Sequence, residues 1–363
     1  FGTLGVDGAA NLFLLNPNGV VFGPNAQLDV SGAFSVTTAE RYSFLAGTAF
    51  SATNPGQAPL VTVSITPGVQ FNGAPQGDIT NQGNLAVGAE QTLALHGDTV
   101  TNSGDLTAEG GTVLVLGNQV ALTGQATVEV SSATGGGDVY IGGDYKGQGD
   151  LPTAQQAVVE AGVTINADAV ETGDGGTVIV WADDTTQFAG SISARGGSLS
   201  GNGGFVETSG AQTLNVAPTA TVTTAAANGE WGTWLLDPAD LQVIGTGTGT
   251  IDATGDNDPA ATTISAVTIV TALNSTAVTL LATNSITVDE AIDSSGNANA
   301  NNLTLQATTL NLNQDISTNG GQVYDGSVAL GADVTLTGDT VTFNNTVNGN
   351  QSLTVDITNS GTA

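Results

Sequence analysis

Short stretches in which apolar and polar residues alternate recur along almost the whole chain. An alternation of period two places the apolar side chains on one face of a β-strand. Gly, Asn, Thr, Ser and Asp fill the intervals between these stretches, whereas Lys, Arg and Met, which favour helices, are scarce. The pattern predicts an all-β fold built from short strands. The clearest examples are Thr127-Val128-Glu129-Val130, Leu303-Thr304-Leu305, Leu310-Asn311-Leu312, Val334-Thr335-Leu336, Val341-Thr342-Phe343 and Leu353-Thr354-Val355-Asp356-Ile357.

One segment has a different period. Apolar residues at 264, 267, 270 and 273 are spaced to form one face of a helix, and the pattern ends near Asn274-Ser275. We therefore expect one short helix near residues 264–274.

The chain contains an internal repeat. Residues 79–85 (ITNQGNL) match residues 100–106 (VTNSGDL) at an offset of 21, and residues 120–124 (VALTG) continue the series about 20 residues further on. A Gly-Gly-x-Val unit also recurs, with its glycines expected at corners that require positive φ. A period near 20 predicts a β-solenoid with Asn and Thr ladders at the corners, whereas a propeller needs about 40 residues per blade. The Gly-Gly-x-Val units begin at residues 110, 136, 175, 203 and 320.

Charge and composition exclude several classes of function. The 363 residues include 33 acidic side chains but only three basic ones, Arg41, Lys146 and Arg195, so the net charge is −30. Binding to nucleic acid or to anionic lipid needs a basic surface that this chain lacks. The chain has no Cys and a single His, which argues against thiolate or His-rich metal sites. Its 39% hydrophobic residues argue against disorder. It has no apolar run near the roughly 18 residues of a membrane span, so no membrane insertion is expected.

Residues 11–32 (NLFLLNPNGVVFGPNAQLDVSG) resemble the secretion, or haemagglutination-activity, domain of filamentous-haemagglutinin-like exoproteins. These are the exported proteins of two-partner secretion, and the resemblance is strongest to cyanobacterial members. It extends through residues 44–47, 65–71, 140–145, 203–210 and 234–238.

The resemblance implies a right-handed parallel β-helix with extra-helical loops or hairpins. It also implies export by an outer-membrane two-partner-secretion transporter that recognises the secretion domain. The protein is then secreted, or held on the outer surface of a Gram-negative-type bacterium. Its implied role is that of an adhesin or a surface structure that contacts glycans or proteins of a host or a neighbouring cell. The chain starts at Phe1 without an initiator Met or a signal peptide, so we expect the export signal to lie outside it.

The chain is divided into three parts on this interpretation. Residues 1–75 form the C-terminal part of the secretion domain, residues 76–240 form β-helix repeats, and residues 241–363 form a distal β-rich repeat region. Aromatic residues become rare and the paired glycines disappear after residue 240, until Gly320 and Gly321. Trp231 and Trp234 are expected to cap or plug the end of the first solenoid stretch.

The segment Asn16-Pro17-Asn18-Gly19 separates two apolar runs. Proline fixes φ at the second position of a turn, and Asn-Gly readily adopts positive φ, so these four residues predict a structural turn. The family resemblance adds a role as a secretion motif for the same residues, and the two roles are compatible.

The alternative to an adhesin is a carbohydrate-active β-helix enzyme, either a polysaccharide lyase or a hydrolase. Asp183 and Asp184 could in principle supply an acid and a base. Lyases of this fold, however, need Arg or Lys near the substrate carboxylates, and this chain has only three such residues. His96 is expected at a surface turn. We predict that the chain is not an enzyme and needs no cofactor.

Calcium is a weaker possibility, because two acidic stretches offer the oxygen ligands that Ca²⁺ prefers. Neither stretch matches an EF-hand or a calcium-binding nonapeptide repeat, so solvated loops are favoured. One stretch contains Asp138 and Asp144, and the other contains Asp252, Asp256, Asn257 and Asp258.

Overall fold

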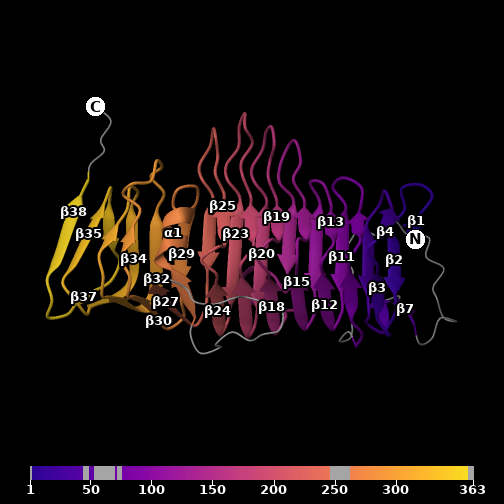
Figure 1. The fold of residues 1–363 in the computed structure, drawn as a ribbon, viewed down its shortest axis with the longest axis horizontal. Coiled ribbons are helices and arrows are strands. Elements are labelled where there is room, and N and C mark those ends of the chain that lie inside the picture. The colour runs from indigo at the N-terminus through magenta and orange to yellow at the C-terminus, as the bar shows by residue number, and fades with distance from the viewer. Residues whose placement is uncertain (1, 44–48, 53–69, 72–75, 246–261, 359–363) are drawn as a thin grey trace.

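The computed structural model describes residues 2–43, 49–52, 70–71, 76–245 and 262–358. The chain forms an elongated rod in which coils of short parallel strands stack along the long axis (Figure 1). The expected parallel β-helix is therefore confirmed. The stacked strands form three faces of the rod.

The first face runs along the whole rod, and each of its strands pairs in parallel with the strand of the next coil. Its strands are β2 (Leu12–Leu15), β5 (Phe34–Thr37), β11 (Thr92–His96), β14 (Thr112–Leu116), β17 (Asp138–Ile141), β20 (Thr177–Ala182), β23 (Phe205–Gly210), β26 (Thr233–Leu236), β29 (Ala277–Leu281), the first half of β32 (Leu303–Leu312), the first half of β34 (Gln322–Leu330) and β36 (Val341–Phe343).

The second face lies beside the first and also runs along the rod. β28 breaks the sequential order, because it inserts between β24 and β27 although it follows both in the chain. The strands are β3 (Val20–Phe22), β9 (Ile79–Asn81), β12 (Thr99–Asn102), β15 (Gln119–Leu122), β18 (Gln156–Val159), β21 (Thr185–Phe188), β24 (Thr213–Val216), β28 (Thr263–Ser265), β27 (Asp240–Ile244), β30 (Ser285–Val288), the second halves of β32 and β34, and β37 (Val347–Asn348).

The third face contains two sheets with the helix α1 (Ala266–Ala272) between them, in contact with β25 and β31 (Figure 1). One sheet comprises β1 (Gly2–Gly5), β4 (Ala26–Asp29), β10 (Asn84–Ala86), β13 (Asp105–Thr107), β16 (Thr127–Glu129), β19 (Thr164–Asn166), β22 (Ser191–Ser193) and β25 (Thr221–Thr223). The other comprises β31 (Ile292–Asp293), β33 (Ile316–Ser317), β35 (Val334–Gly338) and β38 (Leu353–Ile357).

The helix lies where the sequence predicts it, but its buried face differs from the expected one. Ser265 caps its first turn by accepting a hydrogen bond from the Val267 amide. Val267 itself is 60% exposed, and Ala266, Ile269 and Ala272 are buried instead. The reason is that the helix begins only at residue 266, so Ile264 belongs to β28 and does not set the helical phase.

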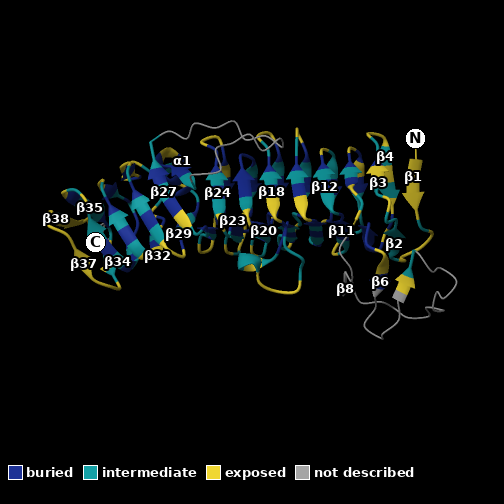
Figure 2. Ribbon diagram, turned by 90° about the horizontal axis from the view of Figure 1, so that it is seen from below, coloured by how far each residue is buried: buried dark blue, intermediate teal, exposed yellow. Residues whose placement is uncertain are grey.

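The repeat offset of 21 is the register of the coils. Val100 pairs with Ile79 on the second face, and Leu106 pairs with Leu85 on the third. These apolar residues are buried and join a single hydrophobic cluster that runs from Phe22 to Leu336. Figure 2 shows buried residues along the length of the rod. The core is continuous across residue 240, and the division of the chain into three parts remains a prediction.

The paired glycines allow close contact between coils more often than they supply unusual φ angles. A Cβ added at Gly137, Gly176 or Gly204, or at the single Gly232 one coil further on, would overlap the carbonyl oxygen of the matching glycine one coil earlier. Among the five Gly-Gly-x-Val pairs, only Gly110 has positive φ. The expectation that these glycines form positive-φ corners is therefore wrong for the other pairs, because backbone contact between coils is what excludes a side chain.

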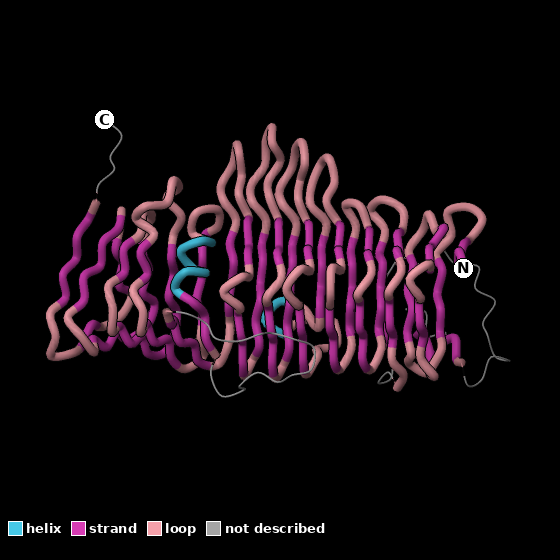
Figure 3. The backbone as a smooth tube through the Cα atoms, in the orientation of Figure 1, coloured by secondary structure: helices cyan, strands magenta, loops and turns pink. Residues whose placement is uncertain are grey.

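Extra-helical structure leaves the rod in three places. An antiparallel sheet of β6 (Arg41–Ser43), β7 (Ala49–Ser51) and β8 (Gln70–Phe71) lies outside the coils, as expected for a hairpin insertion. Segment 142–155 contains the short 3₁₀ helix η2 (Tyr145–Gly147). The third group, which we call the finger loops, comprises residues 130–137, 167–176, 194–204 and 224–232 on one edge of the rod (Figure 3).

Candidate functional site

Asn16 organises the turn between β2 and β3. Its side-chain oxygen accepts a hydrogen bond from the Asn18 amide at 3.2 Å, and its side-chain nitrogen donates to the Gly19 carbonyl at 2.9 Å. The Gly19 amide closes the turn by donating to the Asn16 carbonyl at 3.1 Å, and Gly19 has a φ of +100°. The four residues therefore form the predicted turn, with Asn16 as its main side-chain support.

The same turn packs against the corner of the next coil. A Cβ added at Gly77 would overlap backbone atoms of Pro17 and Asn18, and one added at Gly19 would overlap the Asp78 carbonyl oxygen. Asn18, by contrast, is exposed. The motif thus divides into a structural residue, Asn16, and a residue that faces solvent, Asn18. A role as a secretion motif remains a prediction.

His96 lies inside the fold, so the expectation of a surface turn is wrong. Its side chain is 2% exposed at the end of β11, and its Nδ1 lies 3.1 Å from the Thr37 hydroxyl on β5. Burial lowers the pKa of His96 to about 4. The reason for the error is that β11 continues through residue 96, so the strand places His96 in parallel pairing with Thr37.

The acidic pair proposed for catalysis holds a loop. Asp183 accepts hydrogen bonds from the Thr153 hydroxyl at 2.6 Å and from the Trp181 indole at 3.0 Å, which anchors the end of segment 142–155. Asp184 is exposed. β20, which precedes Asp183, is separated from β11 by β14 and β17, so His96 lies roughly 14 Å away along the stack. The structure does not bring the candidate acid, base and imidazole together.

The calcium candidates have separate positions. Asp138 accepts a hydrogen bond from Thr177, and burial raises its pKa. Asp144 caps η2 by accepting from the Tyr145 amide at 2.7 Å. Within the described ranges, no three His, Cys, Asp or Glu side chains are grouped to hold a metal ion. Asp252, Asp256, Asn257 and Asp258 lie outside the described residues.

The two tryptophans near residue 232 have different roles. Trp234 is fully buried, and its indole donates to the Thr208 hydroxyl at 2.9 Å. β29 stacks directly on β26, so Trp234 does not end the solenoid as expected; the coils continue past it. Trp231 is partly exposed on the last finger loop.

Sequence reasoning missed a buried carboxylate on the first face. Glu207 is fully buried on β23. Both of its carboxylate oxygens accept a hydrogen bond from the Lys146 amide, and the nearer oxygen lies 3.1 Å from that nitrogen. Burial raises the pKa of Glu207 to about 7, and the Asp237 charge adds to that rise. The Lys146 ammonium lies 3.7 Å from an Asp237 carboxylate oxygen. These contacts hold segment 142–155 over β20 and β23. In the sequence, the sign of this arrangement was Lys146, a rare lysine among glycines.

The N-terminal coils are the part of the chain that is similar to known proteins. Residues 1–180 match the family model of the TPS secretion domain, where TPS denotes two-partner secretion. The chain is a two-partner-secretion exoprotein. The turn at residues 16–19, the buried His96 and segment 142–155 of the exoprotein all lie within the matched region. A search of curated proteins finds no match to it. Its assignment to the cyanobacterial type remains a prediction.

The exoprotein contains little helix. No helix in the described part of the chain is long and apolar enough to span a membrane.

Proposed function

We propose that this exoprotein is a non-catalytic adhesin or surface-structure protein that acts outside the cell. The observation that carries the proposal is the continuous stack of coils that begins in the secretion domain. One hydrophobic cluster extends from Phe22 in the matched region to Leu336 far beyond it. A rod of this kind presents its surface at a distance from the point where it is attached. Its net charge of −30 opposes association between rods.

Export is the first step of the proposed function. A TPS domain implies an outer-membrane transporter as its partner. We assign recognition by that transporter to the segment Asn16–Gly19, because the turn is held rigidly by Asn16 while Asn18 remains exposed for contact. A rigid turn with one exposed amide limits the entropy lost on binding.

The polysaccharide lyase or hydrolase is the alternative. Such a site needs an acid and a base on either side of the sugar bond, and a lyase also needs a cation for the sugar carboxylate. The structure supports the adhesin over the enzyme because Asp183 anchors a loop and His96 is buried roughly 14 Å from it.

A retention experiment tests the adhesive role. The purified chain is immobilised, bacteria are passed over it under flow, and a surface coated with albumin, another acidic protein, is the control. We expect several-fold more retained cells on the exoprotein. Retention at the albumin level would overturn the adhesive role.

A turnover assay on neutral and acidic polysaccharides tests the alternative, and we expect no release of reducing ends. Release that is abolished by Asp183→Asn or Asp184→Asn would establish the enzyme instead.

A further inference from the structure

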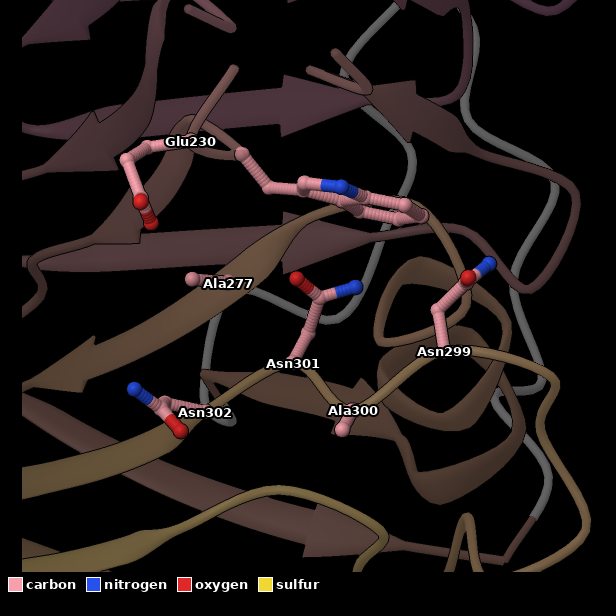
Figure 4. Close-up of a pocket in the computed structure, with 7 residues that line it drawn as sticks. Glu230, Ala277, Asn299, Ala300, Asn301 and Asn302 are labelled. Atoms are coloured by element: carbon pink, nitrogen blue, oxygen red, sulfur yellow. The ribbon is translucent and has the colours of Figure 1, made fainter. Parts of the chain in front are cut away.

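A hollow lies between the last finger loop and the segment that follows β31. It has a volume of about 230 Å³, and Figure 4 shows the residues around it. Its polar lining consists of the Glu230 carboxylate and the amides of Asn299, Asn301 and Asn302, and the indole of Trp231 supplies its aromatic surface. The finger loop leads into β26 and the segment leads into β32; β29 stacks between these two strands, so Ala277 at its start lies between the two walls of the hollow.

Two of the amides are oriented by Leu273, the C-cap of α1, and by Asn274, which follows it. The last carbonyl groups of a helix lack partners within the helix and need donors from elsewhere. The Asn301 side-chain nitrogen donates to the Leu273 carbonyl at 2.9 Å, and the Asn299 nitrogen donates to the Asn274 carbonyl at 2.9 Å. Each of these bonds uses one of the two N–H groups of its amide, so each amide keeps its oxygen as an acceptor and one N–H as a donor. Asn301 is only 9% exposed, so its orientation is well fixed.

The third amide keeps both of its N–H groups. The Asn302 side-chain oxygen accepts from the Gly321 amide at 2.9 Å, and its NH₂ group is available as a donor. Among the described residues, the Glu230 carboxylate and the Trp231 indole nitrogen have no hydrogen-bond partner. The hollow thus offers acceptor oxygens on Glu230, Asn299 and Asn301, N–H donors on the amides and on the Trp231 indole, and an aromatic face.

We infer that this hollow binds a single ring of an uncharged sugar, an inference that rests on the proposed adhesive function and names its ligand class. A sugar ring has an apolar C–H face that packs on an indole, and its hydroxyls both donate and accept hydrogen bonds. The volume is below the roughly 300 Å³ at which pockets for drug-sized ligands begin, so one ring is the appropriate size.

Charge selects against acidic sugars. No Lys or Arg lines this hollow among the described residues, and Glu230 would repel a uronate. The cation Arg195 lines a neighbouring groove that shares Trp231, but Asp168 pairs with it at 2.6 Å. A single ring in an open hollow binds weakly, with a dissociation constant on the order of 1 mM, and many rods on one surface gain strength by multivalency.

The binding test uses the purified chain and the methyl glycosides of glucose, galactose and mannose, with glucuronic acid as the acidic probe. Saturation-transfer NMR detects the bound ring, and tryptophan fluorescence reports on the site because Trp181 and Trp234 are buried whereas Trp231 is partly exposed. We expect at least one neutral glycoside to bind, Trp231→Ala to weaken that binding tenfold or more, and Glu230→Gln to admit glucuronic acid. The control Leu199→Ala removes an exposed apolar side chain from a neighbouring finger loop without touching the hollow.

Failure of all three neutral glycosides to bind, or binding unchanged by Trp231→Ala, would overturn the inference. A cooperative melt equal to that of the Leu199→Ala control shows that the Trp231 variant is folded. Retention of bacteria by Trp231→Ala at the unsubstituted level would overturn the sugar site as the adhesive element and leave the proposed function standing. Retention by the unsubstituted chain at the albumin level would overturn the proposed function alone.

Discussion

Asn81 donates a hydrogen bond from its side-chain nitrogen to the side-chain oxygen of Asn102, one coil further along the rod, at 2.7 Å. Both side chains are completely buried, and each also donates to a backbone carbonyl two residues later in its own coil. An amide ladder of this kind satisfies the polar groups of the corner and fixes the register of neighbouring coils, because a slip of one residue would leave the amides unpaired.

Asn102→Ala tests that ladder. It removes the acceptor for Asn81 and leaves the Gly104 carbonyl without its donor, so we expect a loss of about 1–3 kcal/mol in the free energy of unfolding. Urea denaturation provides the measurement. Asn84→Ala, at an exposed position in the same repeat, is the control and should change stability by less than about 0.5 kcal/mol. Equal effects of the two substitutions would show that the ladder contributes nothing.

The glycine ladder of the first face gives a second prediction. A Cβ at Gly204 would overlap backbone atoms of Gly175 and Gly176, which cannot move without parting the coils. Gly204→Ala should therefore cost about 3 kcal/mol or more. Gly23→Ala is the matched control, because nothing lies within 4 Å of the added carbon and its φ is ordinary. A thermal melt of Gly204→Ala that coincides with that of the control would contradict a close backbone contact between Gly204 and the preceding coil.

The fold could be predicted from the sequence because the period of a solenoid appears as a repeat in the amino-acid sequence. The offset of 21 between Ile79 and Val100 is the pairing register itself, since each coil repeats the side chains that stack on the one before. The short helix was also predictable from its apolar spacing. Its buried face was not, because the end of β28 at Ser265 sets the helical phase and strand ends are poorly encoded in local sequence.

The sites were less predictable, because they depend on contacts between residues far apart in the chain. Local composition suggested a surface turn at His96, yet pairing with Thr37 buries it. Glu207 and Lys146 are 61 residues apart and meet only because segment 142–155 folds back over β23. For Asn16 to Gly19, the turn was readable because its hydrogen bonds are local.

The contrast between Asn16 and Asn18 gives a third prediction. Asn16→Ala removes both side-chain hydrogen bonds of the turn and should lower stability by about 1–3 kcal/mol, whereas Asn18→Ala at an exposed position should leave stability nearly unchanged. If the transporter recognises the turn, Asn18→Ala should nevertheless reduce the amount of exoprotein in the culture medium sharply. Normal export of Asn18→Ala together with a normal melt would assign the motif a purely structural role.

The fourth prediction concerns how stability depends on pH. Two buried groups, Glu207 and His96, change the stability in opposite directions as the pH rises. The raised pKa of Glu207 favours its protonated form in the fold, so its contribution is present below pH 4.5 and is lost as the pH rises to about 7. The lowered pKa of His96 favours its neutral form, so its contribution is present above pH 6.5 and is lost as the pH falls to about 4. Each contribution is about 3 kcal/mol. Between pH 4.5 and 6.5, the stability that Glu207 loses as the pH rises is largely offset by the stability that His96 gains.

Glu207→Gln separates the two groups. The variant keeps a side-chain oxygen that can accept from the Lys146 amide, and it removes the charge that faces Asp237 and Ser209. We expect its stability to fall steadily from pH 6.5 to 4, as His96 alone dictates, and to exceed that of the unsubstituted chain at pH 8. Denaturation series at matched ionic strength provide the measurement, since the two proteins differ by one charge against a net charge of −30. Parallel pH profiles for the two would contradict the assignment to Glu207.

Export that depends on the partner transporter tests most directly whether this rod is a two-partner-secretion exoprotein. The measurement is the fraction of the exoprotein in the culture medium of cells that produce it with or without an outer-membrane transporter of the two-partner type. We expect most of the exoprotein to reach the medium when the transporter is present and almost none when it is deleted. Equal amounts in the medium of both cultures would contradict that expectation.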